Sequence, residues 1–422
     1  MKTIDIYCPD CNAKTFYVLD FIFEAVQDYI YRICKDKADI IKNNGIVNYS
    51  SENIDGALSI PLLENTSSKA VPHFNEHLTV QRGTFNFDCI AAIFYLLSRV
   101  EEYDVTTLDQ HGRYLSTSSI LHQKKLLNKP IVDYWVRDFF KAVSDYYSIE
   151  IKFSQEFNIV STVDVDHIYA FRSKALLLRI GSYIKDVITL NIQRLKDKSM
   201  PEDPFDTYEY ISDLHKELRI ECKYFVLCAD RSQYDRSLLP IHPDFVDVIG
   251  TISRHSRVGI HPSYYSSEKP ALISKEKKAL ERVIAKEIDI SRQHYLKMQV
   301  PETYSQLIMS GIKHDYSMGY SDQLGFRSGT SRSYKWFDCN KNEITKLTVH
   351  PFCIMDVTLR RVSAGDTTKA INIAKDTIDT IKAVGGTFSI VWHNSSFYGT
   401  EGWTGWDKVY SEILRYAKSC IS

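Results

Sequence analysis

The segment 157-FNIVSTVDVDH-167 decides the fold, because an apolar, β-branched run ends there in two aspartates. β-branched residues favour strands, and residues two apart in a strand lie on the same face. Asp164 and Asp166 would therefore place two carboxylates side by side at the end of a strand. Such carboxylates repel unless a cation lies between them. The alternative is an N-cap pair that opens the following helix, since aspartate is a favoured cap.

The composition is that of a large folded protein. The chain has 422 residues, of which 44% are hydrophobic and 25% charged, and its formal net charge is -1. No dense block of lysine and arginine suggests a nucleic-acid partner. No apolar run approaches the roughly 18 residues that span a bilayer, and residues 1–10 lack the apolar core of a signal peptide. We therefore expect a cytoplasmic protein without a membrane span.

The nine cysteines are scattered and form no disulfide-like framework. Cys8 and Cys11 form one CPDC pair, but no second pair follows nearby, and a structural zinc site normally takes four ligands. We interpret the pair as a turn with two ordinary thiols, with a metal or redox role as the alternative.

The pattern of the chain changes near residue 150. Before it, helical patterns at 18–36, 87–104 and 130–147 mix with short strand candidates. We predict a smaller α/β or α+β accessory domain over 1–150. From 157 to 422, strands and helices alternate, as in α/β folds with a largely parallel sheet.

For the second part we predict a distorted (β/α) barrel of about seven strands. The first helix after the opening strand is expected at 170–190. The strands are expected at 157–163, 222–228, 257–260, 291–296, 312–317, 346–356 and 387–393.

Acidic, basic and imidazole side chains stand where these strands end. They are Asp164, Asp166, Asp230, His261, Arg292, His294, Asp315 and His393. The carboxyl ends of barrel strands build active sites, so these side chains would meet at one rim. Carboxylates and neutral imidazoles are ligands for a divalent cation such as zinc. With a free carboxylate as base and a histidine as acid, such a rim suits amide or ester hydrolysis. A structural polar role is the alternative for each residue taken singly.

The motifs of 157–422 resemble those of the polysaccharide deacetylases of the NodB-homology type, carbohydrate esterase family 4. TVDVD (162–166) is similar to the first motif of that family, GIHPSYYS (259–266) to its second, SRQHYL (291–296) to its third and VWH (391–393) to its last. The resemblance implies a NodB-like barrel that removes N-acetyl groups from an amino sugar. The substrate would be an acetylated polysaccharide, an oligosaccharide or its precursor.

The resemblance also implies a role for each matching residue. Asp164 would be the general base, Arg292 would hold it, and His393 would be the general acid. Asp166 and His261 would hold a divalent metal, with zinc expected and cobalt or nickel as alternatives.

One position departs from the pattern of the family. Its second motif usually offers two histidines about four residues apart, as part of a set of at least three ligands. Here Tyr265 stands four residues after His261. His294, or else His167, would complete the ligand set; alternatively water fills the gap, or metal and catalysis are lost.

Loss of the metal would leave a non-catalytic carbohydrate-binding or assembly protein on a decayed deacetylase barrel. A deformylase or another small amidase on the same barrel is a further alternative.

Substrate contacts are expected near the rim. In GFRSGTSRSYKWFD (325–338), an arginine would bind an anionic sugar or a phosphate, unless the segment is a solvated connector. In FYGTEGWTGWD (397–407), tryptophan rings suit stacking on sugars, although at least one is expected to pack the last helix against the barrel. The candidates for substrate contact are Arg327, Trp403, Trp406 and Tyr265.

The segments FYLLSRVEEYD (94–104) and HGRY (111–114) resemble an extra N-terminal domain carried by one branch of the family. The sequence does not define the role of that domain.

Overall fold

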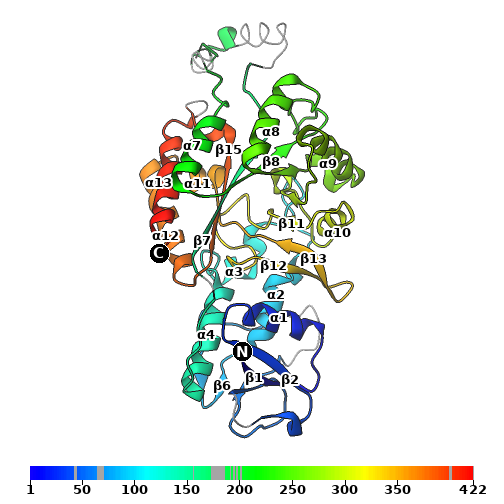
Figure 1. The fold of residues 1–422 in the computed structure, drawn as a ribbon, viewed down its shortest axis with the longest axis vertical. Helices are drawn as coiled ribbons and strands as arrows, with labels where there is room; N and C mark the ends of the chain where they lie inside the picture. The colour runs from blue at the N-terminus through cyan, green and yellow to red at the C-terminus, as the bar shows by residue number, and fades with distance from the viewer. Residues whose placement is uncertain are drawn as a thin grey trace.

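Two β-sheets organise the protein (Figure 1). Its structure is a computed structural model that describes residues 1–41, 45–63, 71–154, 156–172, 186–190, 192, 195, 198–199, 202–398 and 402–421. The first sheet contains β1 (Lys2–Tyr7), β2 (Tyr29–Cys34), β3 (Gly45–Asn48), β4 (Leu58–Ser59), β5 (Val80–Gln81) and β6 (Thr84–Phe85). The order of its strands is β2-β1-β3-β4-β6-β5, and only the β5–β6 pair is antiparallel.

The helices of this first part are α1 (Ala13–Phe23), α2 (Cys89–Leu97), α3 (Ile120–Gln123) and α4 (Ile131–Tyr147), with short 3-10 helices η1 (Lys37–Asp39), η2 (Val100–Glu102) and η3 (Ser116–Ser118). The helix predicted at 130–147 is confirmed by α4, whereas the helix predicted at 87–104 is confirmed only over Cys89–Leu97, because a left-handed Arg99 and the 3-10 helix η2 follow. The helix predicted at 18–36 is wrong in its second half, because α1 ends at Phe23. The next apolar residues form β2, where hydrogen bonds to β1 in parallel register override their helical spacing.

The second sheet has nine strands. They are β7 (Asn158–Val165), β8 (Cys222–Leu227), β9 (Arg257–His261), β10 (Ile290–Ser291), β11 (His314–Asp315), β12 (Tyr334–Asp338), β13 (Glu343–Val349), β14 (Ile354–Met355) and β15 (Thr387–His393). Their order is β12-β13-β11-β10-β9-β8-β7-β15-β14, and only the β12–β13 pair is antiparallel.

The predicted count of about seven strands is not confirmed. Six of the seven predicted segments contain a strand, with 346–356 divided into parts of β13 and β14. The segment 291–296 shares only Ser291 with β10 and forms a 3-10 helix at His294–Leu296. In addition, β12 pairs back onto β13 in a hairpin that the sequence pattern did not predict. Within the described residues, the edge strands β12 and β14 do not pair with each other, so the curled sheet is an open barrel.

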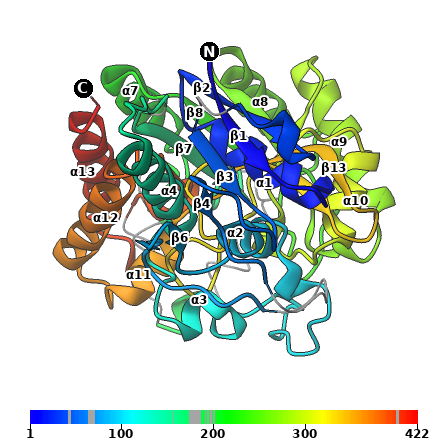
Figure 2. The same ribbon diagram turned by 90° about the horizontal axis from the view of Figure 1, so that it is seen from below.

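Helices surround the second sheet. They are α7 (Tyr208–Leu218), α8 (Pro243–His255), α9 (Ala271–Ile284), α10 (Glu302–Met309), α11 (Asp356–Val362), α12 (Thr367–Lys382) and α13 (Trp406–Ser419), with 3-10 helices η4 (Tyr264–Ser267), η5 (His294–Leu296) and η6 (Asn394–Ser396). Figure 2 shows α7, α11, α12 and α13 on one side and α8, α9 and α10 on the other. The helix predicted at 170–190 lies almost entirely outside the described residues. No described helix combines the length and apolar character needed to cross a bilayer.

Strand β7 lies inside the sheet, between β15 and β8. Its residues from Ser161 to Val165 are all buried, and the hydroxyls of Ser161 and Thr162 are hydrogen-bonded to the Tyr410 hydroxyl and the Ile390 carbonyl. The parallel register pairs Asp164 with His393 of β15. On the other side, β8 ends at Leu227, which pairs with His261 of β9. The strand-end side chains of β7, β9 and β15 therefore arrive at one edge.

A buried charge network joins the two parts of the chain. The guanidinium of Arg327 donates to Glu102 through Nε (2.9 Å) and Nη2 (2.5 Å), and Arg99 Nε donates to the same carboxylate (2.8 Å). Nearby, Asp133 accepts hydrogen bonds from Thr330 (2.5 Å) and Ser331 (2.6 Å). The segment 325–332 is buried and contacts the N-terminal region through these hydrogen bonds. It is therefore an interface segment and not the predicted rim loop.

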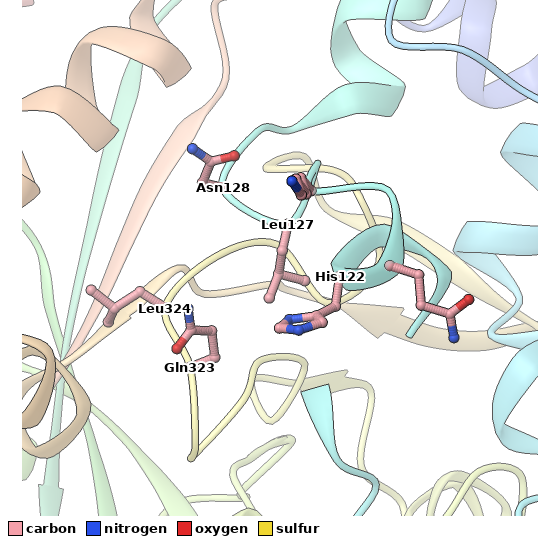
Figure 3. A pocket seen from close by; sticks show the side chains of 7 residues that line it. His122, Leu127, Asn128, Gln323 and Leu324 are labelled. Atoms are coloured by element: carbon pink, nitrogen blue, oxygen red, sulfur yellow. The ribbon is translucent and has the colours of Figure 1, made fainter. Parts of the chain in front are cut away.

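A pocket of about 540 Å³ also lies at this junction, between the α3 region and the loop before Arg327 (Figure 3). Its lining residues are His122, Gln123, Lys125, Leu127, Asn128, Gln323 and Leu324. It is separate from the strand ends that carry the predicted site.

We expect Glu102→Gln to destabilise the protein strongly. Burial opposes ionisation of Glu102, but Arg327 and Arg99 outweigh it and lower its pKa to about 2. The amide would leave the Arg327 guanidinium buried without a counter-charge, at a cost of about 3–5 kcal/mol. Urea unfolding would measure this loss, and the exposed Glu412→Gln serves as a control with little expected change. Equal stabilities of the two variants would contradict the prediction.

Candidate metal centre

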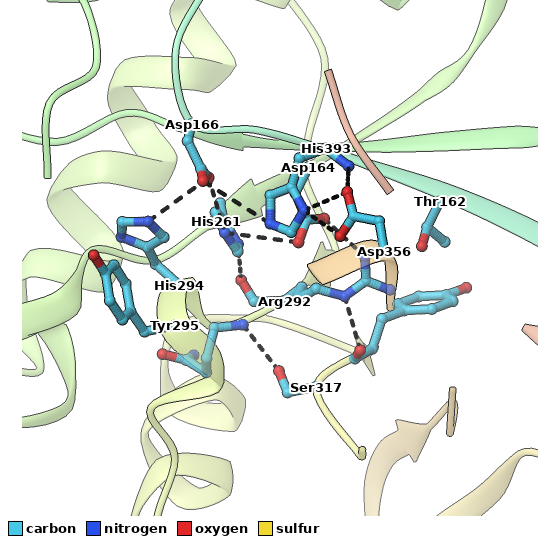
Figure 4. Close-up of polar contacts among 12 residues, drawn as sticks. Thr162, Asp164, Asp166, His261, Arg292, His294, Tyr295, Ser317, Asp356 and His393 are labelled. Atoms are coloured by element: carbon cyan, nitrogen blue, oxygen red, sulfur yellow. Dashed lines mark hydrogen bonds and ion pairs between the residues drawn. The ribbon is translucent and has the colours of Figure 1, made fainter. Parts of the chain in front are cut away.

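A pocket of about 410 Å³ opens at the carboxyl ends of the barrel strands. Five of the predicted site residues line it: Asp164, Asp166, His261, His294 and His393. Figure 4 shows that the side chains of these residues point toward one another. The expected rim is therefore present, and its members come from β7, β9, β15 and the turn after β10.

Asp166, His261 and His294 form a three-ligand cluster. His261 Nε2 lies 3.4 Å from Asp166 Oδ1, and His294 Nε2 lies 3.7 Å from the same oxygen. That oxygen is buried and has no hydrogen-bond partner among the described residues. A zinc ion about 2 Å from each ligand atom would hold those atoms roughly 3–4 Å apart. The three side chains therefore fit a divalent cation.

The orientation of each imidazole favours coordination through Nε2. His261 Nδ1 is hydrogen-bonded to the carbonyl oxygen of Arg292 (2.6 Å). His294 Nδ1 is hydrogen-bonded to Asp235 Oδ1 (2.9 Å). An acceptor at Nδ1 keeps the proton there, leaves the lone pair of Nε2 facing the cluster and raises the basicity of the ligand.

Asp164 stands beside this cluster but is held differently. Its Oδ1 accepts a hydrogen bond from Arg292 Nη1 (2.7 Å), while its Oδ2 lies 3.8 Å from His261 Nε2. Arg292 is fully buried; its Nε donates to the carbonyl of Tyr316 (3.0 Å), and its guanidinium lies 4.5 Å from the Phe225 ring centre. The arginine thus fixes one oxygen of the carboxylate and leaves the other at the pocket.

His393 is paired with Asp356, the first residue of α11. Asp356 accepts from the backbone N–H of His393 through Oδ2 (2.8 Å) and contacts Nδ1 through Oδ1 (2.9 Å). Burial opposes protonation of His393, but Asp356 and, less strongly, Asp166 raise its pKa to about 10. A protonated Nε2 would therefore face the pocket at neutral pH.

Charges within the cluster also shift the other titrating groups. Burial opposes protonation of His294, but Asp166 and Asp235 raise its pKa to about 9. Burial would raise the pKa of Asp166, but His294 and His261 hold it well below its usual range. Without a cation, the site is stabilised as a network of ion pairs, so binding of a metal requires release of a proton.

The structure does not bring every predicted residue to the site. Arg327 is buried against Glu102, and Trp406 is buried against Trp392 at the start of α13. Trp403 packs on Trp406 and on Arg360. None of the three lines the pocket, which does not support their predicted contacts with substrate.

Tyr265 also lies outside the pocket lining, next to the rings of Tyr234 and Tyr264. Of the two residues expected to replace a second motif histidine, His294 joins the cluster, whereas His167 lines the pocket outside it. Asp230 is exposed and paired with Lys275, and Asp315 is buried against two serines.

Sequence reasoning missed several residues that shape the site. Asp356 ends the predicted strand 346–356, so the rule that found Asp164 could have found it. Asp235 lies in an irregular loop after β8 and gave no periodic signal. Gln293 is 1% exposed and lines the pocket, and its Nε2 has no partner within the described part of the chain. His111 and Arg113 reach the pocket from the N-terminal region.

Comparisons with known proteins found one family model and several solved structures of similar fold. Residues 4–148 match the model of a family of unknown function, DUF7033. No curated protein matches the sequence. The structure is similar to that of a Mycobacterium smegmatis protein assigned as a polysaccharide deacetylase, with a TM-score of 0.40 and 14% identity over 63% of this chain and 84% of that chain.

Two further structures show similar likeness. For a peptidoglycan deacetylase from Bacillus subtilis, the TM-score is 0.32 and the identity 13%, over 63% of this chain and 85% of that chain. For a 4-alpha-glucanotransferase from Thermococcus litoralis, the TM-score is 0.36 and the identity 11%, over 63% and 38%. Values this low do not define an activity, which has to be inferred from the geometry of the site.

We expect the purified protein to bind about one zinc, cobalt or nickel ion per chain, and His261→Ala and His294→Ala to lose it, because each removes one of three protein ligands. Elemental analysis after dialysis measures the content. Tyr265→Phe is the matched control and should keep the metal. No metal in the wild type, even after supplementation, would contradict the site. Loss in Tyr265→Phe with retention in His294→Ala would reassign the third ligand.

Proposed function

We propose that the protein is a metal-dependent hydrolase that removes N-acetyl groups from an amino sugar in a polysaccharide or its precursor. The observation that carries this proposal is the Asp166–His261–His294 cluster, which opens to a pocket. Two further polar pairs, Asp164–Arg292 and His393–Asp356, lie beside this cluster. Three protein ligands with an open position are typical of catalytic zinc sites, whereas structural sites are closed by four. Bound there, a divalent cation would polarise the acyl carbonyl and make a water more acidic.

Asp164 is placed to act as general base. One of its oxygens is fixed by Arg292, and the other faces the cluster, within reach of a water at the pocket. Arg292 is a positioning residue in this scheme, because it acts through Asp164.

His393 is placed to act as general acid. Its Nε2 lies 4.0 Å from Asp166 Oδ2, on the opposite side of the cluster from the Asp235-bound His294. Asp356 favours the imidazolium, so Nε2 carries the proton that a departing amine needs. A base and an acid at one cation site are what amide hydrolysis requires, because water must lose a proton and the amine must gain one.

The pocket also suits a polar, uncharged group such as an N-acyl sugar. The side-chain Nε2 of Gln293, which has no partner among the described residues, can donate a hydrogen bond to a substrate oxygen. The ring of Tyr295 lines the same pocket and is 38% exposed, so it offers an apolar face to a pyranose. The motif order TVDVD, GIHPSYYS, SRQHYL and VWH, which resembles that of polysaccharide deacetylases, favours the acetyl group over other acyl groups.

We expect Asp164→Asn to lower the release of acetate from N-acetylglucosamine oligomers by at least about 100-fold, because the amide cannot accept the proton of water. Metal content should stay near that of the wild type, since Asp164 is outside the three-ligand cluster. The control is Asp230→Asn, an exposed strand-end aspartate that is not part of the site.

Normal turnover in Asp164→Asn would contradict the role of the base. A glycan affinity that is unchanged by chelators and by Asp164→Asn, together with no turnover, would favour a non-catalytic carbohydrate-binding protein. A parallel set of N-formyl substrates would identify a deformylase.

We expect Asp356→Asn to shift the alkaline limb of the pH profile of kcat/KM to lower pH by at least about one unit. His393 must be protonated to act as an acid, so activity falls as the pH rises through its pKa. Removal of the Asp356 charge lowers that pKa from its raised value of about 10. An unchanged alkaline limb would mean that another group protonates the amine.

A further inference from the structure

The hairpin 108–114 belongs to the N-terminal region, yet it lines the barrel pocket through His111 and Arg113. Leu108 and Tyr114 form an antiparallel bridge at its base. Asp109 Oδ1 accepts from the backbone N–H groups of His111 (2.8 Å) and Arg113 (2.9 Å). Gly112 has a φ of +75°, which favours glycine. The hairpin is therefore a tightly bonded turn.

The turn that follows His294 has an unusual backbone. Tyr295 and Leu296 both have left-handed φ values, 61° and 52°, which residues with a Cβ rarely adopt. Such conformations persist where surrounding contacts hold them. Because this turn begins directly after His294, the contacts that hold it also set where the third ligand of the cluster lies.

Arg113 supplies one of these contacts. Its Nη1 donates to the carbonyl oxygen of Tyr295 (2.8 Å), and its Nε donates to Asp109 Oδ2 (2.7 Å). The donor is charged and the arginine is anchored at its other face, so the bond is strong and directional. It joins the N-terminal hairpin to the backbone of the left-handed turn.

A second route leads from the same hairpin to the other side of His294. His111 Nδ1 is hydrogen-bonded to the hydroxyl of Tyr264 (3.0 Å). The backbone N–H of Tyr264 donates to Asp235 Oδ1 (2.9 Å), the oxygen that also holds His294 Nδ1. The His111 ring also packs against the Tyr295 ring, with centroids 5.3 Å apart.

We propose that the hairpin 108–114 is a positioning element that fixes His294 as a metal ligand. This inference rests on the proposed metal site. Arg113 holds the turn after His294. His111 contacts Tyr264, whose backbone N–H donates to Asp235, and Asp235 is the partner of His294 Nδ1. The N-terminal region thus completes the site. It holds His294, which follows β10, in place as the third ligand, a role that Tyr265 does not fill.

The test is a double-mutant cycle on metal affinity, measured by competition with a chelator for zinc. Arg113→Ala should weaken zinc binding about 10- to 100-fold, the usual effect of losing an outer contact to a metal ligand. In the His294→Ala background, the weak zinc affinity that remains, measured by direct titration, should be the same with and without Arg113→Ala, because Arg113 acts through that histidine. The visible spectrum of the cobalt-loaded protein should change in Arg113→Ala and keep its wild-type form in the exposed control Arg254→Ala.

Arg113→Lys keeps the charge and one donor, so it provides a folded variant with an intermediate affinity. Unchanged zinc affinity in folded Arg113→Ala, or an equal loss in the presence and absence of His294, would overturn the inference while leaving the proposed hydrolase intact. A wild type that binds neither zinc nor cobalt would instead overturn the metal site itself, and the inference with it.

Discussion

The buried ion pair between Asp164 and Arg292 is the interaction on which the rest of the site depends. A carboxylate at the end of an inner strand is costly unless it is paired and hydrogen-bonded. Arg292 provides the pairing from the position directly after β10, a strand separated from β7 by β8 and β9. It is itself held by the Tyr316 carbonyl. Its own carbonyl holds His261. One residue therefore fixes the orientation of the proposed base and of a proposed metal ligand.

Fixed hydrogen-bond partners also explain how five titrating side chains occupy one pocket. They are Asp164, Asp166, His261, His294 and His393. Each imidazole at the site has an oxygen at Nδ1, supplied by Arg292, Asp235 or Asp356. Against the effect of burial, Asp356 raises the pKa of His393, and Asp166 with Asp235 raises that of His294. His261 instead has the neutral carbonyl of Arg292 at its Nδ1.

Much of this arrangement could be predicted from the sequence, because it follows from strand ends in a parallel sheet. Asp164, Asp166, His261 and His393 each terminate an apolar run, and parallel strands bring their ends together. The errors have the same physical origin. Arg327 and the tryptophans were assigned by residue type, yet long-range burial decides their contacts. Asp235 and Arg113 lie in irregular turns, which have no periodic sequence pattern. Their partners, His294 and Tyr295, are more than fifty residues away in sequence and could not be predicted.

Tyr265 shows why a missing motif residue does not by itself remove a site. A cation is bound by atoms at suitable distances, not by positions in a motif. The strand order places the turn after β10 next to the end of β9, so a histidine there reaches the same oxygen of Asp166. The left-handed turn needed for that reach carries a conformational cost, and the hairpin from the N-terminal region supplies contacts that offset it. In the proposed metal site, the place of His294 and the hairpin that holds its turn therefore belong to one structural arrangement.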